Sequence, residues 1–470
     1  HTAIDIINAI ENEIPNVIED FSYDINIPRQ KISHSLLKLK AFKNFDFGKL
    51  IMRYDFQVND RKEFDIRRGD RTKPALDLNL QTHSLAFDLE SKFQNNSNLK
   101  VGISGRYQKN FPDPYTGVKR IIPDYKKYDF SVYSIYDISF ERNWLLEGGI
   151  RYDFSHINAY KYYRTSLWEA RNYDELFPEI VVEDLGLNTL TNPKFNFNNF
   201  SSNLGTRFTI NNGENIYFNY SISSRKPNPS ELFSEGLHHS SARIEIGDLS
   251  FNSEVGHNIS LTYNFANEKS NLTVNSFANY VNDFIYIIPV DIMPTIAGVF
   301  PYWEYKQQDA KLFGFDIKYD RQYFNNFFVG HQFSLIKGYE RENNKPLINM
   351  PPVNLKNQFS YNFPEFNNLN ISLESEFVFR QNEYPNNNFE VYIPTEETYE
   401  WLDTSTPPGS YHLLNFASSI GFKSNKGGIY KINLRVENIL NNLYKDYLNR
   451  LRYFTHEMGR NILVSLSYSY

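Results

Sequence analysis

The last ten residues, 461–470, constrain the fold of this chain more than any other stretch. Large apolar side chains alternate there with small polar ones, so one face carries Ile462, Val464, Leu466, Tyr468 and Tyr470, and the other carries Ser465, Ser467 and Ser469. A period of two with one apolar face indicates a half-buried β-strand. A soluble sheet usually covers or blunts such an edge. A membrane β-barrel instead uses its final strand to close the ring, with lipid on one face and an aqueous lumen on the other.

The same alternation recurs along the chain, for example at 216–223, 369–380 and 430–437. The polar faces of the last two segments carry full charges, among them Glu374 and Arg435. Charged inner faces suit a wet lumen better than a dry core. From about residue 33 onwards, the pattern predicts roughly seventeen strands and no helix longer than a few turns. The sequence therefore predicts an all-β, antiparallel transmembrane barrel.

The connections between the predicted strands alternate between short and long. Tight turns rich in Asn, Gly and charged residues are predicted at 44–48, 94–98, 141–143, 211–215, 267–271, 324–327, 364–368 and 423–428. Longer excursions lie between them, including 157–195, 224–254, 288–303, 339–353, 384–411 and 446–460. Short turns on one rim and long loops on the other are typical of an outer-membrane barrel. If Tyr470 ends at the periplasmic rim, all the tight turns lie there and all the long loops lie outside.

The composition argues against several other classes of protein. Aromatic residues make up 16% of the chain, with 34 Tyr and 39 Phe, and a barrel uses such residues at both membrane–water interfaces. No run approaches the ~18 apolar residues of a membrane-spanning helix. The absence of cysteine removes disulfides and thiolate metal sites, and a net charge of -6 argues against a nucleic-acid partner. No P-loop, nucleophile elbow or catalytic carboxylate pair is present, so we expect no enzyme and no resident cofactor.

The strand count suggests that the chain belongs to a longer protein. Roughly seventeen strands is an odd number, whereas single-chain bacterial barrels have an even number. The first reliable strand, 36–44, heads towards the periplasm, and the polar stretch before it reads as an outer loop. We therefore divide the chain into an extracellular segment, 1–31, and a barrel, 32–470. We also predict that a barrel built from this chain alone has a gap beside its first and last strands.

Several stretches of the sequence resemble the TonB-dependent outer-membrane receptors. In that family an Arg-x-Pro box followed by Glu-Leu-Phe closes one strand, and an Asn-Pro-Asp-Leu type of box opens the next. Ser224–Phe233 is similar to the first box, and Gly247–Glu254 is similar to the second but lacks its Asn-Pro. Tyr302–Gly314 is also similar, and Val436–Tyr444 with Gly459–Asn461 is the most specific match. The residues that we expect to have structural roles in these motifs are Pro227, Gly247, Glu254, Asn438, Gly459 and Tyr470.

The resemblance implies a receptor in the bacterial outer membrane with a 22-stranded barrel around an amino-terminal plug. This chain would supply roughly strands 6 to 22 of such a barrel and no plug. The implied partners are the lipid bilayer, a metal-chelate ligand and the TonB–ExbB–ExbD complex, whose contact region is not found in this sequence. Whether a surface lipoprotein also binds the outer loops stays open. The implied function is binding and import of a chelate, a ferric siderophore first and zinc or haem next. A passive porin or an outer-membrane barrel enzyme is the alternative.

Two adjacent histidines, His238 and His239, lie between the first two boxes. Neutral imidazole is a common ligand of zinc and of haem iron, and in zinc and haem receptors of the family a histidine in this place often has that role. The alternative use is a loop whose polar residues attach it to the barrel wall. The chain has no cysteine and no His-x3-His spacing, which favours the second use.

Other residues suit a chelate as well. The guanidinium groups of Arg225 and Arg243 can pair with carboxylate or catecholate-like oxygens of a chelate, with Glu231 nearby. Trp303 and Tyr305 offer a stacking surface for a planar ligand. Loop packing is an equally good use of these and other outer aromatic residues, among them Tyr163, Trp168, Tyr399 and Trp401. The arginines at 61, 67, 68 and 71 alternate with acids at 60, 63, 65 and 70, which favours a self-neutralising ladder.

Overall fold

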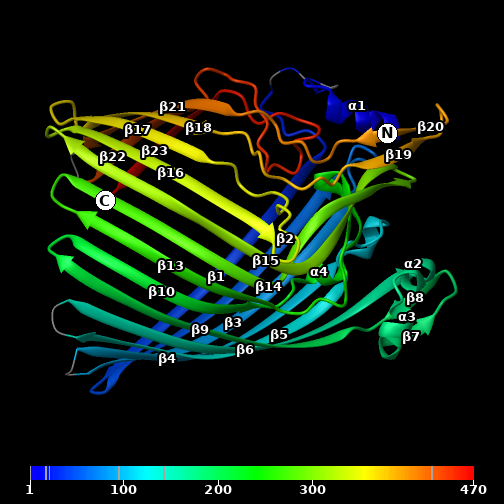
Figure 1. Ribbon diagram of the computed structural model, residues 1–470, viewed down its shortest axis with the longest axis horizontal. Coiled ribbons are helices and arrows are strands. Elements are labelled where there is room, and N and C mark those ends of the chain that lie inside the picture. Colours follow the sequence, from blue (N-terminus) through cyan, green and yellow to red (C-terminus); the bar gives the residue numbers. More distant parts are fainter. Residues whose placement is uncertain are drawn as a thin grey trace.

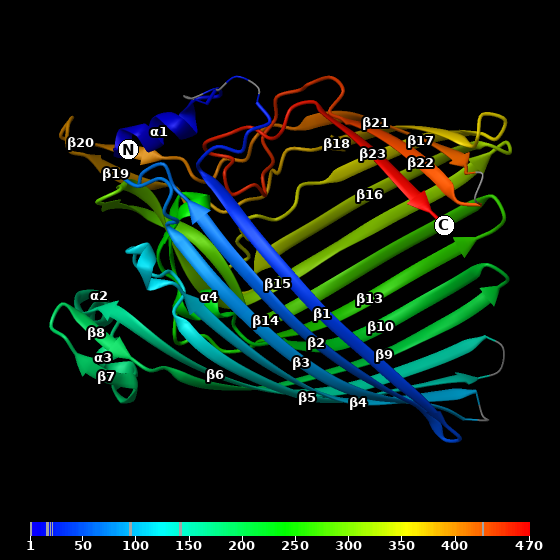
Figure 2. The ribbon, with the colours of Figure 1, turned by 180° about the vertical axis from the view of Figure 1, so that it is seen from behind.

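The computed structural model describes residues 2–15, 18, 20, 22–93, 96–140, 143–424 and 427–470. One curved antiparallel sheet forms the wall of the protein (Figure 1, Figure 2). Over the described residues this sheet has 21 strands, of which β7, β8, β11 and β12 belong to outer connections, and the other seventeen form the wall. The predicted all-β class and the predicted number of wall strands are confirmed.

The wall strands follow one another round the sheet in chain order, each antiparallel to the next. They are β1 (Arg29–Phe45), β2 (Gly48–Phe64), β3 (Leu76–Phe93), β4 (Ser97–Pro112), β5 (Asp124–Phe140), β6 (Trp144–Arg164), β9 (Lys194–Asn211), β10 (Glu214–Arg225), β13 (Glu254–Ala266), β14 (Ser270–Thr295), β15 (Gly298–Tyr323), β16 (Phe327–Glu340), β17 (Asn354–Phe363), β18 (Leu369–Val378), β21 (Tyr411–Lys423), β22 (Ile429–Glu437) and β23 (Asn461–Ser469).

The two faces of the wall differ because successive side chains of a strand point to opposite sides. Ile157 and Ala159 of β6 belong to a buried cluster with Leu232 and Phe233, which come from a connection folded into the barrel. Their face is therefore the inner one. Residues paired across strands share a face, so the register extends this assignment round the wall. The inner face carries ion pairs such as Arg151–Asp153 at 2.7 Å, Lys356–Glu376 at 3.0 Å and Arg53–Asp88, as expected for a polar lumen.

The sheet does not close on itself. Among the described residues no backbone pairing joins β1 to β23, and the two strands lie on either side of an opening (Figure 2). All seventeen residues of β1 are exposed, including Leu36, Leu37 and Phe42. Unpaired edges of this kind leave a row of backbone N–H and C=O groups available. The predicted gap beside the first and last strands is confirmed.

The connections obey the predicted two-sided rule. Tight turns gather at the rim where the chain ends, and long connections gather at the opposite rim (Figure 1). Parts of the predicted turns 94–98, 141–143 and 423–428 lie outside the described residues. The outer connections contain α2 (Thr165–Ala170), α3 (Tyr173–Leu176), α4 (Pro229–Phe233), three 3-10 turns (Pro114–Thr116, Pro178–Ile180 and His239–Ser241) and the strands β7 (Val181–Asp184), β8 (Asn188–Thr191), β11 (Glu235–His238), β12 (Arg243–Ile246), β19 (Phe389–Ile393) and β20 (Thr398–Leu402).

The prediction of a long loop at 288–303 is wrong. The strands β14 and β15 run through it, each 26 residues long, and meet in a short turn at Ile296 and Ala297. The hairpin persists because β12 adds to the outer end of β15 in parallel, from Ile244 opposite Tyr302 to Ile246 opposite Glu304. Backbone pairing with a distant segment thus holds a stretch that local sequence suggested was irregular.

The predicted outer segment 1–31 also contains a helix, α1 (Ala3–Glu11), which the sequence interpretation did not identify. Thr2 and Asp5 form a capping box at its start. Ile6 and Ile7 pack in a cluster with Val391, Ile393 and Leu402 of the β19–β20 hairpin. An isolated helix of this length is marginal in water, so the tertiary contact stabilises it. In the described parts of the chain, no helix is long and apolar enough to cross a membrane.

Candidate ligand-binding site

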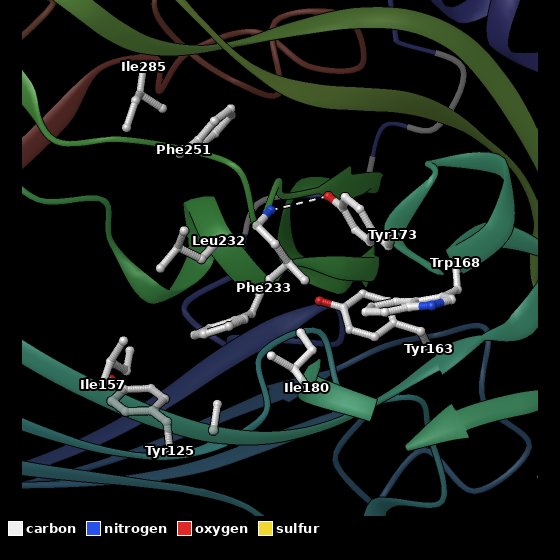
Figure 3. Close-up of a cluster of buried hydrophobic side chains, with 12 residues drawn as sticks. Tyr125, Ile157, Tyr163, Trp168, Tyr173, Ile180, Leu232, Phe233, Phe251 and Ile285 are labelled. Carbon is white, nitrogen blue, oxygen red and sulfur yellow. Dashed lines mark hydrogen bonds between the residues drawn. The ribbon is translucent and has the colours of Figure 1, made fainter. Parts of the chain in front are cut away.

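The connection between β10 and β13, residues 226–253, folds into the outer mouth of the barrel. Asn228 caps α4, and Pro229 occupies its first turn. The helix places Leu232 and Phe233 inward, where they are 1% and 0% exposed. They lie between Ile157 of the wall and the aromatic residues of the β6–β9 connection (Figure 3). This apolar pair anchors the connection to the wall.

An ion-pair cluster joins the two boxes that the sequence singled out. Arg225 Nε donates to Glu254 Oε2 at 2.5 Å, and Arg225 Nη1 donates to both carboxylate oxygens of Glu231 at 3.0 and 3.1 Å. Glu254 also accepts from the backbone N–H of Ile285 at 2.6 Å, and Glu231 accepts from that of Asn228 at 2.7 Å. The structure thus brings together Arg225 and Glu231, which were predicted to bind ligand, and engages both in tying the connection to the wall.

Gly247 lies where two segments of backbone meet. A Cβ at this position would lie 2.5 Å from the carbonyl oxygen of Glu231 and 2.8 Å from the carbonyl carbon of Leu232, so a larger residue forces the segments apart. Arg171 Nη1 donates to the carbonyl oxygen of Gly247 at 2.8 Å. The expected structural role of Gly247 therefore has a physical basis, and Pro227, at the start of the same connection, is buried.

Tyr173 forms hydrogen bonds with the next two residues of the second box, Asp248 and Leu249. Its hydroxyl donates to Asp248 Oδ1 at 2.9 Å. It also accepts from the backbone N–H of Leu249 at 3.2 Å, the bond drawn as a dashed line in Figure 3. Burial and the charge of Asp248 raise the pKa of this tyrosine, against a smaller opposing effect of Arg171. Sequence reasoning missed Arg171 and Tyr173, because they lie some 75 residues from the box and only the fold brings them there.

The two histidines have different surroundings. His238 Nδ1 lies 3.0 Å from Glu245 Oε1, and its Nε2 lies 3.7 Å from Glu63 Oε1. Burial alone would lower the pKa of His238, but the hydrogen bonds and charges of these two carboxylates raise it to about 9. His238 therefore attaches the connection to β2, where Arg61 Nη2 also lies 3.3 Å from its Nε2. His239 Nδ1 lies 2.7 Å from Asp65 Oδ2, while its buried Nε2 has no hydrogen-bond partner among the described residues.

A cavity of about 730 Å³ adjoins His239. It lies between the outer end of β2, the 226–253 connection and the tip of the β14–β15 hairpin. Apolar side chains form much of its lining, among them Leu237, Ile244, Ile246 and Met293. Its charged lining residues are Arg67, Arg68, Lys119 and Arg164 against Asp65 and Glu235. The cavity thus combines an apolar wall with an excess of positive charge, and His239 is one of its lining residues. In the described residues, no group of three or more His, Cys, Asp or Glu side chains is arranged to hold a metal ion.

The remaining candidate ligand residues are not among the described residues that line this cavity. Arg243 is 4% exposed, donates to Glu245 Oε1 at 2.7 Å, and its guanidinium lies 4.7 Å from the ring centre of Trp303. Trp303 is itself buried, and Tyr305 packs against the central apolar cluster. Tyr163 and Trp168 belong to that cluster, whereas Trp401 is 61% exposed on β20. Which of these contacts a ligand stays a prediction.

The predicted ladder of charges forms in part at the outer end of β2, where two of its four arginines pair with acids and Arg68 donates to backbone carbonyl oxygens instead. Arg61 pairs with Glu63, and Arg67 Nε pairs with Asp65 at 2.6 Å. The two acids also receive the connection, since Glu63 accepts from the backbone N–H of Ser240 at 3.0 Å and Asp65 faces His239. The ladder is therefore not only self-neutralising. Its acids also bind His239 and Ser240 of the 226–253 connection.

A buried lysine, missed by the sequence interpretation, lies under the same connection. Lys161, near the outer end of β6, is 3% exposed, donates to the carbonyl oxygen of Phe233 at 2.6 Å and lies 3.5 Å from Glu235 Oε2. Burial lowers the pKa of Lys161 from 10.5 to about 8, against the opposing charge of Glu235. Lys119 pairs with the same carboxylate.

This lysine predicts an increase of stability with pH. Because its folded pKa lies below its unfolded value, the unfolded state binds more protons between about pH 8 and 10.4, and the free energy of unfolding rises across that range. The gain is on the order of 3 kcal/mol at most. We expect the unfolding temperature of Lys161→Met to rise less with pH than that of the wild type, measured in detergent from pH 7.5 to 10.5. Parallel profiles would contradict the assignment.

The carboxyl-terminal motif forms a compact turn. Asn438, in a left-handed conformation with φ of 48°, exchanges hydrogen bonds of 2.9 Å with the backbone of Asn442. A Cβ on Gly459 would lie 2.8 Å from Asn441 Oδ1, which accepts from the backbone N–H of Arg460. Tyr470 lies beyond the last residue of β23, with its ring centre 6.4 Å from that of Tyr468. Asn438 and Gly459 thus shape the approach to the final strand.

Comparisons with solved structures give the same architecture at low sequence identity. The chain is similar to the "Copper transporter OprC", with a TM-score of 0.71 and 12% identity over 93% of this chain and 65% of that one. It is also similar to the FrpB iron transporter of Neisseria meningitidis (TM-score 0.61, 14% identity, 93% of this chain and 63% of that one). A third is the ferric enterobactin receptor PfeA of Pseudomonas aeruginosa (TM-score 0.61, 11% identity, 94% and 62%). The chain thus spans less than two thirds of the length of these proteins. No curated protein sequence matches it.

A family model for the "TonB dependent receptor-like, beta-barrel" matches residues 16–439. This match covers most of the chain and includes both boxes around the Arg225 cluster. Members of the family are receptors and transporters of the bacterial outer membrane, not enzymes. With its curved antiparallel wall, its short turns on one rim and its folded loops on the other, this chain belongs to the TonB-dependent receptor family.

Proposed function

We propose that this chain forms most of the barrel of a receptor that binds a metal chelate outside the cell and imports it with energy from TonB, ExbB and ExbD. The observation that carries the proposal is the cavity of about 730 Å³ at the outer mouth, with His239 on its border. Its volume and largely apolar lining are typical of sites for drug-sized ligands. Release into the lumen then requires a second state of the receptor that binds the chelate less tightly.

Within this site we assign the metal contact to His239 rather than His238. A metal-bound histidine usually donates its other ring N–H to a carboxylate, which fixes the ring and the tautomer. His239 has such a partner in Asp65 and an Nε2 without a hydrogen-bond partner among the described residues, whereas His238 Nδ1 faces Glu245 and its Nε2 lies near Arg61 and Glu63. This arrangement favours a chelate whose metal keeps an open coordination position, such as haem iron or a partly coordinated zinc ion.

A ferric siderophore is the second candidate. Its iron is already fully coordinated, so it needs no protein ligand, and recognition falls on the charge of the complex. The four cationic side chains of the cavity outnumber its two carboxylates, and Arg67 and Lys119 each already pair with one of these. Over the described residues Arg68 donates to backbone carbonyl oxygens alone, at 2.6 Å, and pairs with no carboxylate, so its positive charge is free to attract an anion. An anionic chelate suits that surplus.

We further propose that the complete receptor has 22 wall strands and a plug in its lumen. Two observations support this architecture. The edges of β1 and β23 are unpaired over the described residues, and the chain spans 65% of the length of the copper transporter that it resembles. Strands that pair with both edges would satisfy their backbone groups, which a bilayer requires.

Binding and conductance of the full-length protein test the function together. We expect submicromolar binding of at least one of haem, zinc or a ferric siderophore in detergent, and uptake of that ligand by cells that stops when the proton-motive force is removed. Planar-bilayer recordings should show no large steady conductance. A large open channel without saturable binding of any of the three would favour the porin and reject the receptor.

A further inference from the structure

A row of aromatic and histidine side chains crosses the outer face of five neighbouring wall strands. The register places Phe56 of β2 opposite His83 of β3, His83 opposite Tyr107, Tyr107 opposite Tyr128, and Tyr128 opposite His156 of β6. These residues face outward because Ile157, the neighbour of His156, belongs to the inner cluster. The ring centres of Phe56 and His83 lie 4.6 Å apart, and those of Tyr107 and Tyr128 lie 5.1 Å apart.

This row marks one boundary of the lipid-facing band. On the periplasmic side of this row, most of the next side chains that face outward are large and apolar or aromatic: first Leu85, Phe130 and Phe154, then Phe87, Ile103, Val132 and Tyr152. Most of these side chains are 38–49% exposed. Rings of aromatic residues flank the apolar band of outer-membrane barrels at both interfaces. The Phe56–His156 row therefore lies at the outer membrane–water interface.

The next row towards the outside is basic. Gln81 pairs with Lys109, Lys109 with Lys126, Lys126 with Asn158, and Asn158 with Lys194. The three lysines are exposed, and over the described residues none has a carboxylate within ion-pair distance. The nearest acid on the same face of β5, Asp124, is paired with Arg120. Lys109 and Lys126 are direct cross-strand neighbours, and like charges in this position repel.

We propose that Lys109 and Lys126, with Lys194 beside them, bind the phosphate groups of a phosphorylated glycolipid in the outer leaflet. The row lies one register step outside the aromatic interface, at the height of lipid head groups. A phosphate between Lys109 and Lys126 would convert their repulsion into two charge-assisted contacts. The acyl chains of the same molecule would lie along the apolar rows below. This site is on the outer wall and does not depend on the ligand cavity.

Native mass spectrometry of the full-length protein in detergent tests this site with three probes: diphosphorylated lipid A, the same lipid without its phosphates, and inorganic phosphate. We expect diphosphorylated lipid A to bind Lys109→Gln/Lys126→Gln at least tenfold more weakly than the wild type. The dephosphorylated lipid should bind both proteins equally weakly. Lys109→Arg/Lys126→Arg keeps both charges and should retain binding.

A matched control places the same charge change on the opposite rim. Lys269 and Lys423 are exposed near tight turns, and Lys269→Gln/Lys423→Gln should bind lipid A like the wild type. Equal binding by Lys109→Gln/Lys126→Gln and the wild type overturns the proposal. So does displacement of the lipid by millimolar inorganic phosphate, which would mean a site for the free ion. Heat-dependent migration on gels confirms that each variant is folded.

Discussion

Replacing His239 by alanine is expected to weaken the binding of haem or zinc about 100-fold, because it removes the metal contact that we propose at the cavity while leaving the wall intact. Asp65→Asn, which keeps the size of the side chain but loses the carboxylate that orients the ring, is expected to cost about 10-fold or more. Titration of the full-length protein, followed by the Soret band for haem and by calorimetry for zinc, measures both changes.

His238→Ala is the matched control for this prediction. It removes the neighbouring imidazole, which faces Glu245 and Glu63, and we expect at most a few-fold change in affinity with a lower unfolding temperature. Equal losses in the two single variants would mean that the histidines act through the fold of the connection. If a ferric siderophore binds and His239→Ala leaves its affinity unchanged, the histidine assignment fails and Arg68 becomes the residue to test.

The second large effect is expected from Phe233→Ala, which should lower the free energy of unfolding by about 3–5 kcal/mol. Phe233 is 0% exposed in the cluster that anchors the 226–253 connection. The surrounding residues come partly from the wall, such as Ile157 and Tyr163, and partly from other packed connections, such as Trp168 and Phe251, so we expect them to collapse little into the space left behind. Thermal unfolding in detergent measures the loss, and limited proteolysis shows whether cleavage concentrates in this connection.

Phe324 provides the control for that substitution. It lies in a tight turn on the opposite rim and is 84% exposed, so Phe324→Ala should change the free energy of unfolding by less than about 0.5 kcal/mol. A comparable loss in both variants would mean that the connection is not anchored by Phe233. Lys161 donates to the carbonyl oxygen of Phe233. We therefore expect a moderate further loss of stability when Lys161 is replaced in the Phe233→Ala variant.

Alternation along the chain was sufficient for the class of fold. A strand that faces lipid on one side and water on the other must alternate its side chains, and the segments 216–223 and 430–437 both lie in wall strands of the structure. The turn positions were predicted from composition instead, since Asn- and Gly-rich segments are where the direction of the chain reverses. The odd number of strands was also visible, and with it the open edge between β1 and β23.

Local sequence was insufficient for the long outer elements. The 288–303 segment contains prolines and looked irregular, yet β12 pairs with it from 50 or more residues away. Helix α1 was missed because its apolar residues, such as Ile6 and Ile7, are few and meet their partners only in the β19–β20 hairpin. In both cases the stabilising contact lies far away in sequence, where periodicity carries no signal.

The sequence by itself determined the curved β-sheet wall and its two rims, because lipid and water impose a period of two on every wall strand. Only the tertiary structure decided the surroundings of His238 and His239. The two are adjacent and chemically identical, yet one lies between two carboxylates and the other borders the cavity, because Glu63 and Asp65 reach them from β2 and the residue after it. The role of a loop histidine depends on the partners that a distant strand supplies, and these partners are fixed by the folding of the connection against the wall.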